Sequence, residues 1–281
     1  MDFVEAIFRT AAFRVSPADQ PFWYTSGLFG PYYINSHFVY GSEQEAKAFL
    51  AAIEEAAEGE RRDFTAKLLP LVTAQLEHSA IYRDIIDHMA DYVQEQLPEL
   101  DLISGGERRD FFFSLPLAWK LGLPHLSIFK DGSCYYNERL AERAQTEGEL
   151  GLAGRSCLHV ADLITEASSY FRNWLPCLER LGLRAVASLA LVDRCQGGVE
   201  KLESAGIQTH CLLQIRPELF SQARVKGLID QAQEAQLQRY YEDPRAYVRQ
   251  FLAEQPQFLD REARRDAKTR ERVERLRSLE L

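Results

Sequence analysis

The stretch that decides the fold is Cys157–Ser169, which reads Cys-Leu-His-Val-Ala-Asp-Leu-Ile-Thr-Glu-Ala-Ser-Ser. An apolar run typical of a buried strand ends in the acidic Asp162, and a short segment rich in Thr and Ser then opens a helix. At the edge of a sheet, such a carboxylate can accept hydrogen bonds from ribose hydroxyls, and the hydroxyl and N–H groups of the turn can surround a phosphate. Ordinary helix capping explains the same pattern, so both interpretations stay open.

Strands and helices alternate on both sides of this stretch. The segments between the β-like runs have the pattern of helices. Strands that alternate with helices imply crossover connections, and therefore a mostly parallel sheet covered on both faces. We expect an α/β fold. The five β-like runs are Leu100–Ser104, His125–Lys130, Ser156–Val160, Ala185–Val192 and Thr209–Ile215.

Three parts of the chain lie outside this alternation. Residues 1–15 have apolar side chains at helical spacing and predict a helix, followed by a segment rich in aromatic residues, Gly and Pro. The middle part has a helical pattern in which Pro70 marks a helix boundary, and the last part predicts three helices. We therefore divide the chain into N-terminal elements (1–41), a helical insertion (42–97), an α/β core (98–216) and a helical C-terminal extension (217–281).

Composition excludes several classes of protein. The chain has 281 residues, with 42 acidic and 33 basic side chains and a net charge of -9, which disfavours non-specific binding to nucleic acid. No apolar run approaches the ~18–20 residues that span a bilayer, and Asp2 and Glu5 are unlike the basic start of a signal peptide. Five cysteines without a CxxC pair disfavour a disulfide framework or a zinc site. We expect a cytoplasmic protein that binds neither nucleic acid nor membrane.

Four stretches, in the same order, resemble one known family. Cys157–Ser169 is similar to the phosphoribosyl-pyrophosphate (PRPP) motif of the type I phosphoribosyltransferases. Tyr24–Asn35, Leu121–Pro124 and Leu191–Ile207 are similar to further elements of the orotate phosphoribosyltransferase family. The resemblance implies a mostly parallel sheet flanked by helices, with a small N-terminal hood formed by residues 1–41. The helical insertion and the helical extension lie outside it.

The same resemblance implies an activity and a set of site residues. The activity is transfer of ribose 5-phosphate from PRPP to orotate or a related pyrimidine base, with Mg²⁺ as cofactor and release of pyrophosphate by a homodimer. No residue is assigned as a direct metal ligand, although Asp162 could contribute indirectly. The implied catalytic residues are Asp162 and Lys130; those for the base are Thr165, Arg194, Tyr33 and Asn35; those for phosphate are Ser168, Ser169, Gly105 and Gly106.

At several positions the chain departs from the family's pattern. Ala161 replaces the first acidic residue of the PRPP motif, Thr25 replaces a lysine that contacts phosphate, and Glu166 adds negative charge beside the expected phosphate. Residues 131–150 lack the Lys- and His-containing pattern of the mobile catalytic loop. A lost hydrogen bond to a charged group costs about 1.5–3 kcal/mol. Several such losses would slow catalysis by orders of magnitude unless other groups compensate.

Two functions therefore stay open, and the order of the motifs favours the first. The chain is an enzyme of the phosphoribosyltransferase type, or it is a catalytically impaired homologue that binds a nucleotide or base as a regulatory or assembly module. An unrelated doubly wound protein is a third possibility. Cationic side chains that could restore the lost contacts are Arg108, Arg109, Lys130, Arg139 and Arg143.

Overall fold

The computed structural model describes residues 1–24 and 26–279; Thr25, Glu280 and Leu281 lie outside it. The described chain folds into two compact units. The first comprises residues 1–11 and 36–215, and the second comprises residues 12–35 and 216–281. The departure from the family pattern at Thr25, and the end of the predicted helical extension, therefore stay untested.

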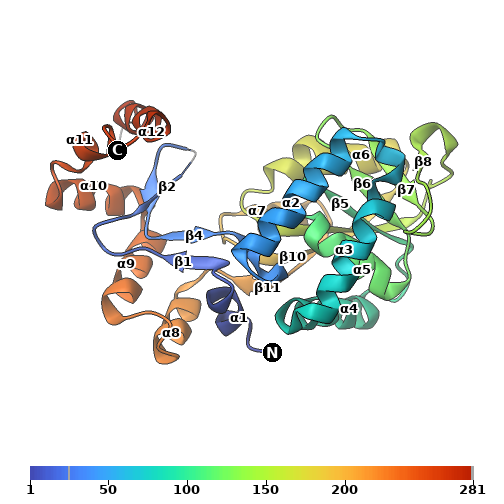
Figure 1. Ribbon diagram of the computed structural model, residues 1–281, viewed down its shortest axis with the longest axis horizontal. Helices are drawn as coiled ribbons and strands as arrows, with labels where there is room; N and C mark the ends of the chain where they lie inside the picture. The colour runs from blue at the N-terminus through green and yellow to red at the C-terminus, as the bar shows by residue number, and fades with distance from the viewer. Residues whose placement is uncertain (25, 280–281) are drawn as a thin grey trace. The chain divides into compact units, whose positions relative to one another are not determined.

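The first unit is built on a seven-stranded sheet with the strand order β11-β10-β9-β5-β6-β7-β8 (Figure 1). Five strands run parallel, whereas β7 and β8 are each antiparallel to the preceding strand. All five strands predicted from the sequence are present, and the predicted α/β fold is confirmed. The strands are β5 (Leu102–Gly106), β6 (His125–Ile128), β7 (Cys134–Asn137), β8 (Gln145–Thr146), β9 (Ser156–Ile164), β10 (Arg184–Asp193) and β11 (Gln208–Gln214).

Strand β9 lies at the middle of this sheet, between β5 and β10. Its first six residues are buried, which agrees with the nearly continuous apolar run in its sequence. The sequence analysis missed the hairpin β7–β8, because these strands are short, lie at the sheet edge and carry several polar side chains. The carboxyl ends of β5, β9 and β10 meet at one edge of the sheet, since the three strands run parallel.

Helices cover the sheet in two layers on one side. Helix α5 packs on β5 and β9, and α3 and α4 pack in turn on α5. The helical elements of this unit are α1 (Phe3–Arg9), η1 (Ser36–Tyr40), α2 (Glu43–Glu58), η2 (Arg61–Asp63), α3 (Phe64–His78), α4 (Ala80–Gln96), α5 (Phe111–Leu121), η3 (Glu147–Glu149), the π-helical turn η4 (Tyr170–Trp174), α6 (Leu175–Arg180) and α7 (Gly198–Ser204).

Two local predictions are wrong. The helix expected over residues 1–15 ends at Arg9, because Ala11 adopts a left-handed conformation (φ 56°) and Phe13–Val15 forms a strand. Pro70 lies inside α3 and does not mark a boundary. The buried side chains of α3 continue from Leu68 to Val72 across the proline, so packing outweighs the one backbone hydrogen bond that proline removes.

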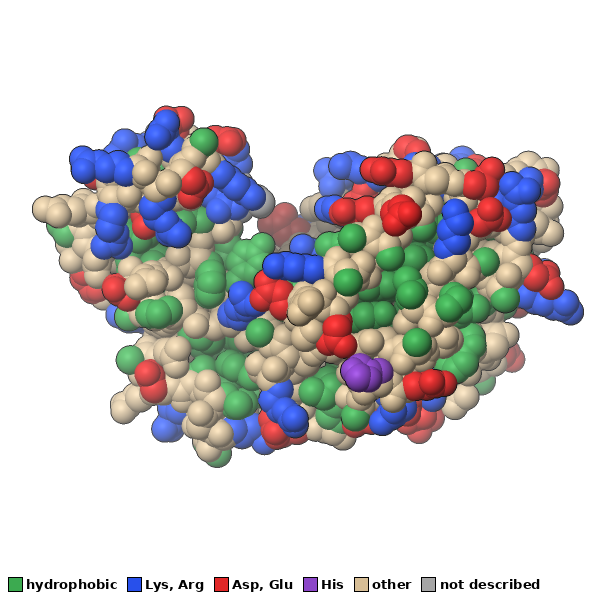
Figure 2. Space-filling view, in the orientation of Figure 1, with side chains coloured by type: hydrophobic (Ala, Val, Ile, Leu, Met, Phe, Trp, Pro, Cys, Tyr) green, Lys and Arg blue, Asp and Glu red, His purple; other side chains and the backbone are tan. Residues whose placement is uncertain are grey.

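The second unit contains two small antiparallel sheets, in which β1 pairs with β4 and β2 pairs with β3. Aromatic rings form its core, with Trp23 stacked on Phe258 and Phe29 edge-on to Phe251. Lys and Arg side chains gather over α11 and α12 (Figure 2). Its elements are β1 (Phe13–Val15), β2 (Phe22–Trp23), β3 (Phe29–Gly30), β4 (Tyr32–Ile34), α8 (Pro217–Val225), α9 (Gln231–Glu242), α10 (Pro244–Glu254), α11 (Phe258–Glu262) and α12 (Ala267–Arg277).

The last of the three predicted C-terminal helices is divided into α11 and α12, and α8 precedes the other two. The four-part division of the chain stays a prediction. Contacts within the described chain place the helices between Glu43 and Gln96 in the same unit as the sheet, and residues 12–35 with the last helices. None of the described helices is long and apolar enough to cross a membrane.

Candidate functional site

The carboxyl end of β9 lines a cavity of about 130 Å³ in the first unit. The rest of the wall comes from the segment after β5 and from η4. Two neighbouring elements of the predicted PRPP motif, the acidic residue and the Thr/Ser turn, therefore share one cavity. The lining residues are Glu107, Asp110, Ala161, Asp162, Leu163, Ile164, Thr165, Ala167, Ser168, Ser169, Tyr170 and Trp174.

Backbone strain is concentrated at this edge of the sheet. Five described residues other than glycine have positive φ, and four of them follow the carboxyl ends of β5, β9 and β10: Glu107, Arg108, Ala167 and Cys195. Ala167 has φ 56°, a conformation that costs a residue with a Cβ atom about 1–2 kcal/mol. This alanine stands where the family's motif has glycine, so the turn keeps a left-handed backbone although the glycine is lost. Such strain is typical of ligand-binding loops.

The turn after β9 presents polar groups that have no partner within the protein. Among the described residues, the hydroxyl groups of Thr165, Ser168 and Ser169 make no hydrogen bond, and all three side chains line the cavity. Gly198 packs so closely against this turn that a Cβ atom there would collide with the Thr165 carbonyl oxygen. The turn is therefore held from behind while its hydroxyl groups stay available to a ligand.

Asp162 is half-buried and held in place from two sides. The Ser36 hydroxyl donates a 2.5 Å hydrogen bond to its Oδ2 atom, and its backbone N–H donates a 2.9 Å hydrogen bond to Asp110 Oδ1. Burial raises the pKa of the Asp162 carboxyl, while the Ser36 hydrogen bond and the charge of Arg109 act in the opposite direction. A carboxylate held in this way can accept hydrogen bonds from vicinal hydroxyl groups of a sugar.

The structure adds a second carboxylate that the sequence analysis missed. Asp110 is only 5% exposed, lines the same cavity, and also accepts a hydrogen bond from the Gly106 N–H at 3.3 Å. Burial, followed by the charge of Asp162, raises the pKa of Asp110 well above its usual range. Asp110 thus ties the end of β5 to the end of β9. It supplies an acidic side chain beside Asp162, where Ala161 has none.

Arg109 was named from the sequence only as one of several possible compensating cations. Its half-buried guanidinium donates no hydrogen bond and forms no ion pair within the described residues, and its charge opposes the rise in the pKa of Asp162 that burial causes. The signal for both residues was the charged run Glu107-Arg108-Arg109-Asp110 directly after two glycines. The order of the strands brings this charged run close to Asp162, because β5 and β9 are neighbours in the sheet.

Other predicted site residues lie outside the Asp162 cavity. Gly105 and Gly106 are buried in β5, and a Cβ atom at Gly106 would lie 2.8 Å from the Trp174 ring, so close packing alone accounts for that glycine. Lys130 is exposed and lines a different cavity, of about 430 Å³. Arg194 follows β10, and its backbone N–H donates a 2.9 Å hydrogen bond to the Ile164 carbonyl at the end of β9.

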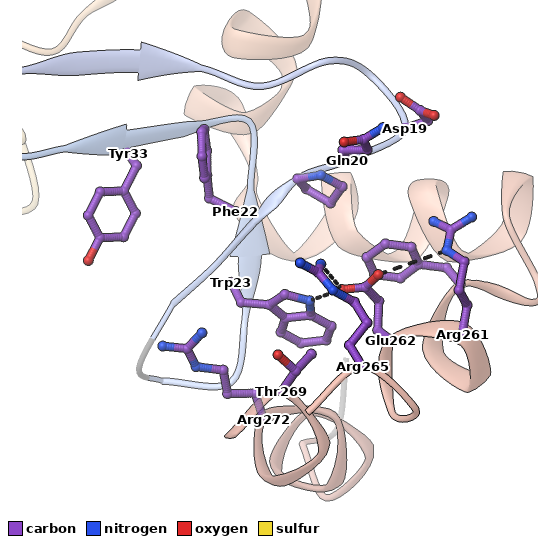
Figure 3. A pocket seen from close by; sticks show the side chains of 12 residues that line it. Asp19, Gln20, Phe22, Trp23, Tyr33, Arg261, Glu262, Arg265, Thr269 and Arg272 are labelled. Atoms are coloured by element: carbon purple, nitrogen blue, oxygen red, sulfur yellow. Dashed lines mark hydrogen bonds and ion pairs between the residues drawn. The ribbon is translucent and has the colours of Figure 1, made fainter. Parts of the chain in front are cut away.

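Tyr33 and Asn35 belong to the second unit. Tyr33 lines a cavity of about 800 Å³ in that unit, together with Trp23 and side chains of the last two helices (Figure 3). Trp23 Nε1 donates a 3.0 Å hydrogen bond to the buried carboxylate of Glu262. Asn35 follows β4, and its backbone N–H donates to the Ala12 carbonyl at 2.8 Å.

The arginines of the expected mobile loop are held in ion pairs. Residues 131–149, here called the hairpin, contain β7, β8 and η3. Arg139 pairs with Glu142, and Arg143 pairs with two acidic residues near the end of the helix α2, Glu60 and Asp63. The Ala144 N–H also donates a 2.7 Å hydrogen bond to the carbonyl of Arg62. Arg108 likewise pairs with Glu54. Of the five cations named from the sequence, Arg109 is thus the one near Asp162.

Comparison with known proteins finds relatives that match part of the chain. The chain is 28% identical to a uridine 5′-monophosphate synthase from Bos taurus, over 39% of its own length and 24% of that protein. It is 38% identical to an adenine phosphoribosyltransferase from Roseiflexus castenholzii, over 22% of its own length and 34% of that protein. The chain thus spans about a third or less of these two relatives. No family model matches it.

Two solved structures cover 85% of the chain. A UMP synthase from Leishmania donovani has a TM-score of 0.56 at 16% identity, and 41% of that chain is covered. An orotate phosphoribosyltransferase from Francisella tularensis has a TM-score of 0.55 at 12% identity, and 97% of it is covered. The chain has the type I phosphoribosyltransferase fold. The fold that the sequence motifs implied is thereby confirmed. Both of these solved structures are enzymes by their names.

The described residues do not offer a preformed metal site. No group of three or more His, Cys, Asp or Glu side chains among them could hold a metal ion. Of the three carboxylates that line the cavity, Asp110 accepts a backbone hydrogen bond on each of its oxygens and is a poor ligand, which leaves Asp162 and Glu107. Mg²⁺ is often held by one or two carboxylates together with substrate phosphates, so Asp162 fits a metal that arrives with a phosphorylated substrate.

Proposed function

We propose that this protein transfers ribose 5-phosphate from PRPP to a nitrogenous base, with release of pyrophosphate. The observation that carries the proposal is the turn Thr165–Ser169, with its strained Ala167 and three unpartnered hydroxyl groups beside Asp162. Orotate is the first candidate for the base, because the sequence motifs resemble those of orotate phosphoribosyltransferases. The resemblance of the chain to an adenine phosphoribosyltransferase makes adenine the second candidate.

In this proposal each group of the cavity has one task. Asp162 accepts hydrogen bonds from the ribose hydroxyls, and Thr165, Ser168 and Ser169 donate hydrogen bonds to the 5′-phosphate. Arg109 supplies positive charge next to Asp162, where the substrate carries pyrophosphate. Asp110 holds Asp162 through its backbone N–H and acts as a positioning residue.

Further parts of the proposal rest on the family resemblance. Mg²⁺ would neutralise charge on the pyrophosphate group, with Asp162 as the protein carboxylate nearest to it. Lys130, Gly105 and Gly106 would contact the phosphate groups, and Arg194, Tyr33 and Asn35 would hold the base. A homodimer and a cytoplasmic location complete the proposal; all five cysteines are free thiols, as a reducing compartment favours.

The cavity of about 130 Å³ is smaller than the roughly 300–1,000 Å³ of most ligand pockets. Substrate binding therefore requires the walls to open, and the Trp174 side chain from η4 is one of these walls. Conformational closure around a substrate is common among enzymes that must exclude water.

Release of pyrophosphate tests the proposal directly. The purified full chain is mixed with PRPP, Mg²⁺ and, in separate reactions, orotate, uracil, adenine, guanine and hypoxanthine. We expect pyrophosphate and one nucleoside monophosphate in equal amounts with one of these bases. The matched control is Asp162→Asn, which should remove most of the signal. Absence of pyrophosphate with every base would refute the transferase.

A second candidate function is binding without turnover, as a regulatory or assembly module. The observation that favours it is the pairing of the hairpin arginines. Arg139 forms an ion pair with Glu142, and Arg143 forms ion pairs with Glu60 and Asp63. An enzyme of this kind must stabilise departing pyrophosphate with cations. Without such cations, binding would remain while the chemical step slows.

Thermal stabilisation distinguishes the two functions. Binding to the folded state alone raises stability by RT ln(1 + [L]/Kd), about 2.7 kcal/mol at a hundredfold excess over Kd. A binding module should show this shift with PRPP, orotate or a nucleoside monophosphate, and the shift should vanish in Asp162→Asn, without any product. No shift with any of these ligands would exclude this function as well.

A further inference from the structure

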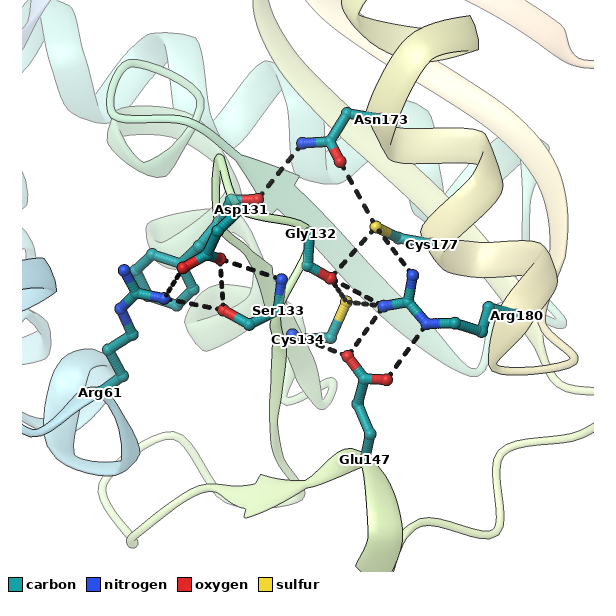
Figure 4. Close-up of polar contacts among 10 residues, drawn as sticks. Arg61, Asp131, Gly132, Ser133, Cys134, Glu147, Asn173, Cys177 and Arg180 are labelled. Atoms are coloured by element: carbon teal, nitrogen blue, oxygen red, sulfur yellow. Dashed lines mark hydrogen bonds and ion pairs between the residues drawn. The ribbon is translucent and has the colours of Figure 1, made fainter.

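Two of the five cysteines lie together at a place that the proposed function does not use. Cys134 begins β7, in the hairpin, and Cys177 lies in α6, 43 positions later in the chain. Their side chains meet over the turn at Gly132 (Figure 4). The thiol groups lie 3.6 Å and 3.5 Å from the same Gly132 carbonyl oxygen. Two sulfur atoms that share one acceptor are near neighbours.

A single cation contacts both sulfur atoms. Arg180 Nη2 lies 3.7 Å from Cys134 Sγ, and Arg180 Nη1 lies 3.8 Å from Cys177 Sγ. Nη2 also donates a 2.7 Å hydrogen bond to the Gly132 carbonyl. Glu147 in turn holds this guanidinium, with hydrogen bonds of 2.8 Å and 3.1 Å to Arg180 Nη2 and Nε. The arginine is therefore fixed beside the two thiols.

The surroundings shift the pKa values of the two thiols in opposite directions. The hydrogen bond from the Cys134 thiol, aided by the charge of Arg180, lowers the pKa of Cys177 to about 6 against the opposing effect of burial. The same hydrogen bond and burial raise the pKa of Cys134. Both shifts favour the thiolate at Cys177 and the protonated thiol at Cys134. A thiolate with a neighbouring thiol is the arrangement of cysteines that form reversible disulfides.

We propose that Cys134 and Cys177 form a disulfide when the protein meets a peroxide, with Cys177 reacting first and Cys134 resolving. This inference does not depend on the proposed transferase activity, because none of these residues lines the Asp162 cavity. A small oxidant such as hydrogen peroxide reaches the pair from the turn at Gly132. Both side chains are 2% exposed, but Lys130 and Asp131 of that turn are exposed and Gly132 is half-exposed.

The reaction balances with hydrogen peroxide as the oxidant. The Cys177 thiolate sulfur attacks one peroxide oxygen, the O–O bond breaks, and the departing hydroxide takes up a proton to become water. Cys177 is left as a sulfenic acid. The Cys134 sulfur then attacks the Cys177 sulfur, the S–O bond breaks, and the hydroxyl group leaves as water with the proton of the Cys134 thiol. Two thiols lose two electrons, and one hydrogen peroxide becomes two molecules of water.

The new bond would join the hairpin to α6. That helix directly follows η4 in the chain, and η4 lines the Asp162 cavity through Tyr170 and Trp174. In the reduced protein, Arg180 of α6 connects these two segments by donating hydrogen bonds of 2.7 Å to the Gly132 carbonyl and 2.8 Å to Glu147 of the hairpin. A disulfide would add a covalent bond to these hydrogen bonds, and the two segments could then no longer separate.

Peptide mapping tests the proposal on the full chain without any substitution. The protein is treated with hydrogen peroxide, remaining thiols are blocked with an alkylating reagent, and the digest is analysed under non-reducing conditions. We expect a linked pair of peptides that contain Cys134 and Cys177, two hydrogens lighter than their sum, and its disappearance on treatment with dithiothreitol. Cys157, which is fully buried with a pKa raised to about 12, serves as the internal control and should stay a free thiol.

Variants assign the order of the two steps. In Cys134→Ser, Cys177 should accumulate as a sulfenic acid that a dimedone reagent traps, whereas Cys177→Ser should leave Cys134 unmodified. Arg180→Gln should slow alkylation of Cys177 several-fold at pH 7, since it removes the positive charge that stabilises the thiolate. Cys211→Ser is the matched control and should form the same disulfide at the same rate as the unchanged chain.

Three results would overturn the proposal. The first is a link that involves another cysteine. The second is sulfenic or sulfinic acid at Cys177 of the unchanged chain with no link to Cys134. The third is alkylation of Cys177 that is not at least about tenfold faster than that of Cys157, because a thiolate and a buried thiol differ by more than this in reactivity. All three are read from the unchanged chain, so they do not depend on how well the variants fold.

Discussion

Two segments of the first unit, the edge of β9 and the hairpin, use their charged groups in opposite ways. At the edge of β9 (residues 161–169 together with Asp110), the carboxyl groups of Asp110 and Asp162 face one cavity, and three hydroxyl groups have no partner among the described residues. In the hairpin (residues 131–149), acidic and basic side chains are matched in pairs, such as Arg143 with Asp63 and Glu147 with Arg180.

The two segments differ in what their charged groups contribute to stability, and this difference bears on where a ligand binds. Ion pairs between exposed side chains contribute about 0–1 kcal/mol each, so the hairpin is accounted for as a small gain in stability. A buried carboxyl beside a second carboxylate and an alanine with positive φ both cost stability. A protein keeps costly groups together where they serve a ligand. These costs support our proposal that a ligand binds at the edge of β9, whereas the ion pairs of the hairpin need no substrate to account for them.

The largest expected effect comes from exchanging a carboxylate for an amide in each segment. Asp162→Asn removes the charge that accepts ribose hydroxyls, and a hydrogen bond to a charged group contributes about 1.5–3 kcal/mol. We expect kcat/KM, or the association constant for PRPP if there is no turnover, to fall by roughly 10- to 150-fold. Asp131→Asn, in the hairpin, should leave both values unchanged. Steady-state kinetics and titration calorimetry measure them.

The reverse pattern would break the comparison between the two segments. If Asp131→Asn impairs binding as much as Asp162→Asn does, the hairpin takes part in the site, and its ion pairs must open when substrate binds. Circular dichroism of both variants provides the control for folding, because Asp162 also accepts a hydrogen bond from Ser36.

The next effect concerns the arginines. Arg109 has no ion pair within the described residues and lies near Asp162, whereas Arg143 is paired with Glu60 and Asp63. We expect Arg109→Gln to weaken PRPP binding about tenfold, which corresponds to ~1.4 kcal/mol, and Arg143→Gln to change it less than twofold. Raising the salt concentration should weaken binding to the unchanged chain more than to Arg109→Gln. Equal losses in both variants would assign the hairpin arginine to the substrate.

Most of the fold could be predicted because its signals are local. Each of the five parallel strands is a short apolar run bounded by polar residues, and their alternation with helices specifies the class of sheet. Short edge strands carry no such signal, so β7 and β8 were missed. At Pro70 the local rule failed, because side chains on both sides of the proline pack into the core and keep α3 continuous.

The site was predictable only where it is contiguous in sequence. Asp162, Thr165, Ser168 and Ser169 lie within eight residues of one another, and the strand-turn-helix geometry brings them to one cavity. Asp110 is 52 residues away from Asp162, and its contact with that residue exists only because β5 is the neighbour of β9. No spacing rule could indicate this. The pairing of the hairpin arginines is likewise a matter of tertiary structure.

A smaller effect concerns the dependence of stability on pH, which should have opposite signs in the two segments. Burial raises the pKa of Asp110, so its contribution to stability is complete below the unfolded-state pKa near 4 and is lost as the pH rises through the folded-state pKa. Hydrogen bonds from Ser133 and Arg61 lower the pKa of Asp131 to about 2, so its contribution is present above pH 4 and is lost as the pH falls towards 2.

Asparagine variants at these two positions test the signs. Asp110→Asn should gain stability relative to the unchanged chain as the pH rises above 4, since it removes a carboxyl that is costly to ionise. Asp131→Asn should be less stable than the unchanged chain at pH 6, and the difference should disappear near pH 2. Urea unfolding at several pH values measures both. A pH-independent difference for Asp110→Asn would mean that this carboxyl has an ordinary pKa.

The smallest effect is expected when one alanine in each segment is replaced by glycine. Ala167 has a positive φ, so Ala167→Gly removes strain, and we expect unfolding to require about 0.5–1 kcal/mol more free energy. Ala144, in the hairpin, is buried without a positive φ, and Ala144→Gly should lower stability by a similar amount. Because glycine also occupies position 167 in the family's motif, Ala167→Gly should bind PRPP at least as tightly as the unchanged chain. Weaker binding would mean that the stiffness of alanine helps to hold this turn in its ligand-binding conformation, and the strain at the edge of β9 would then be a requirement of the site.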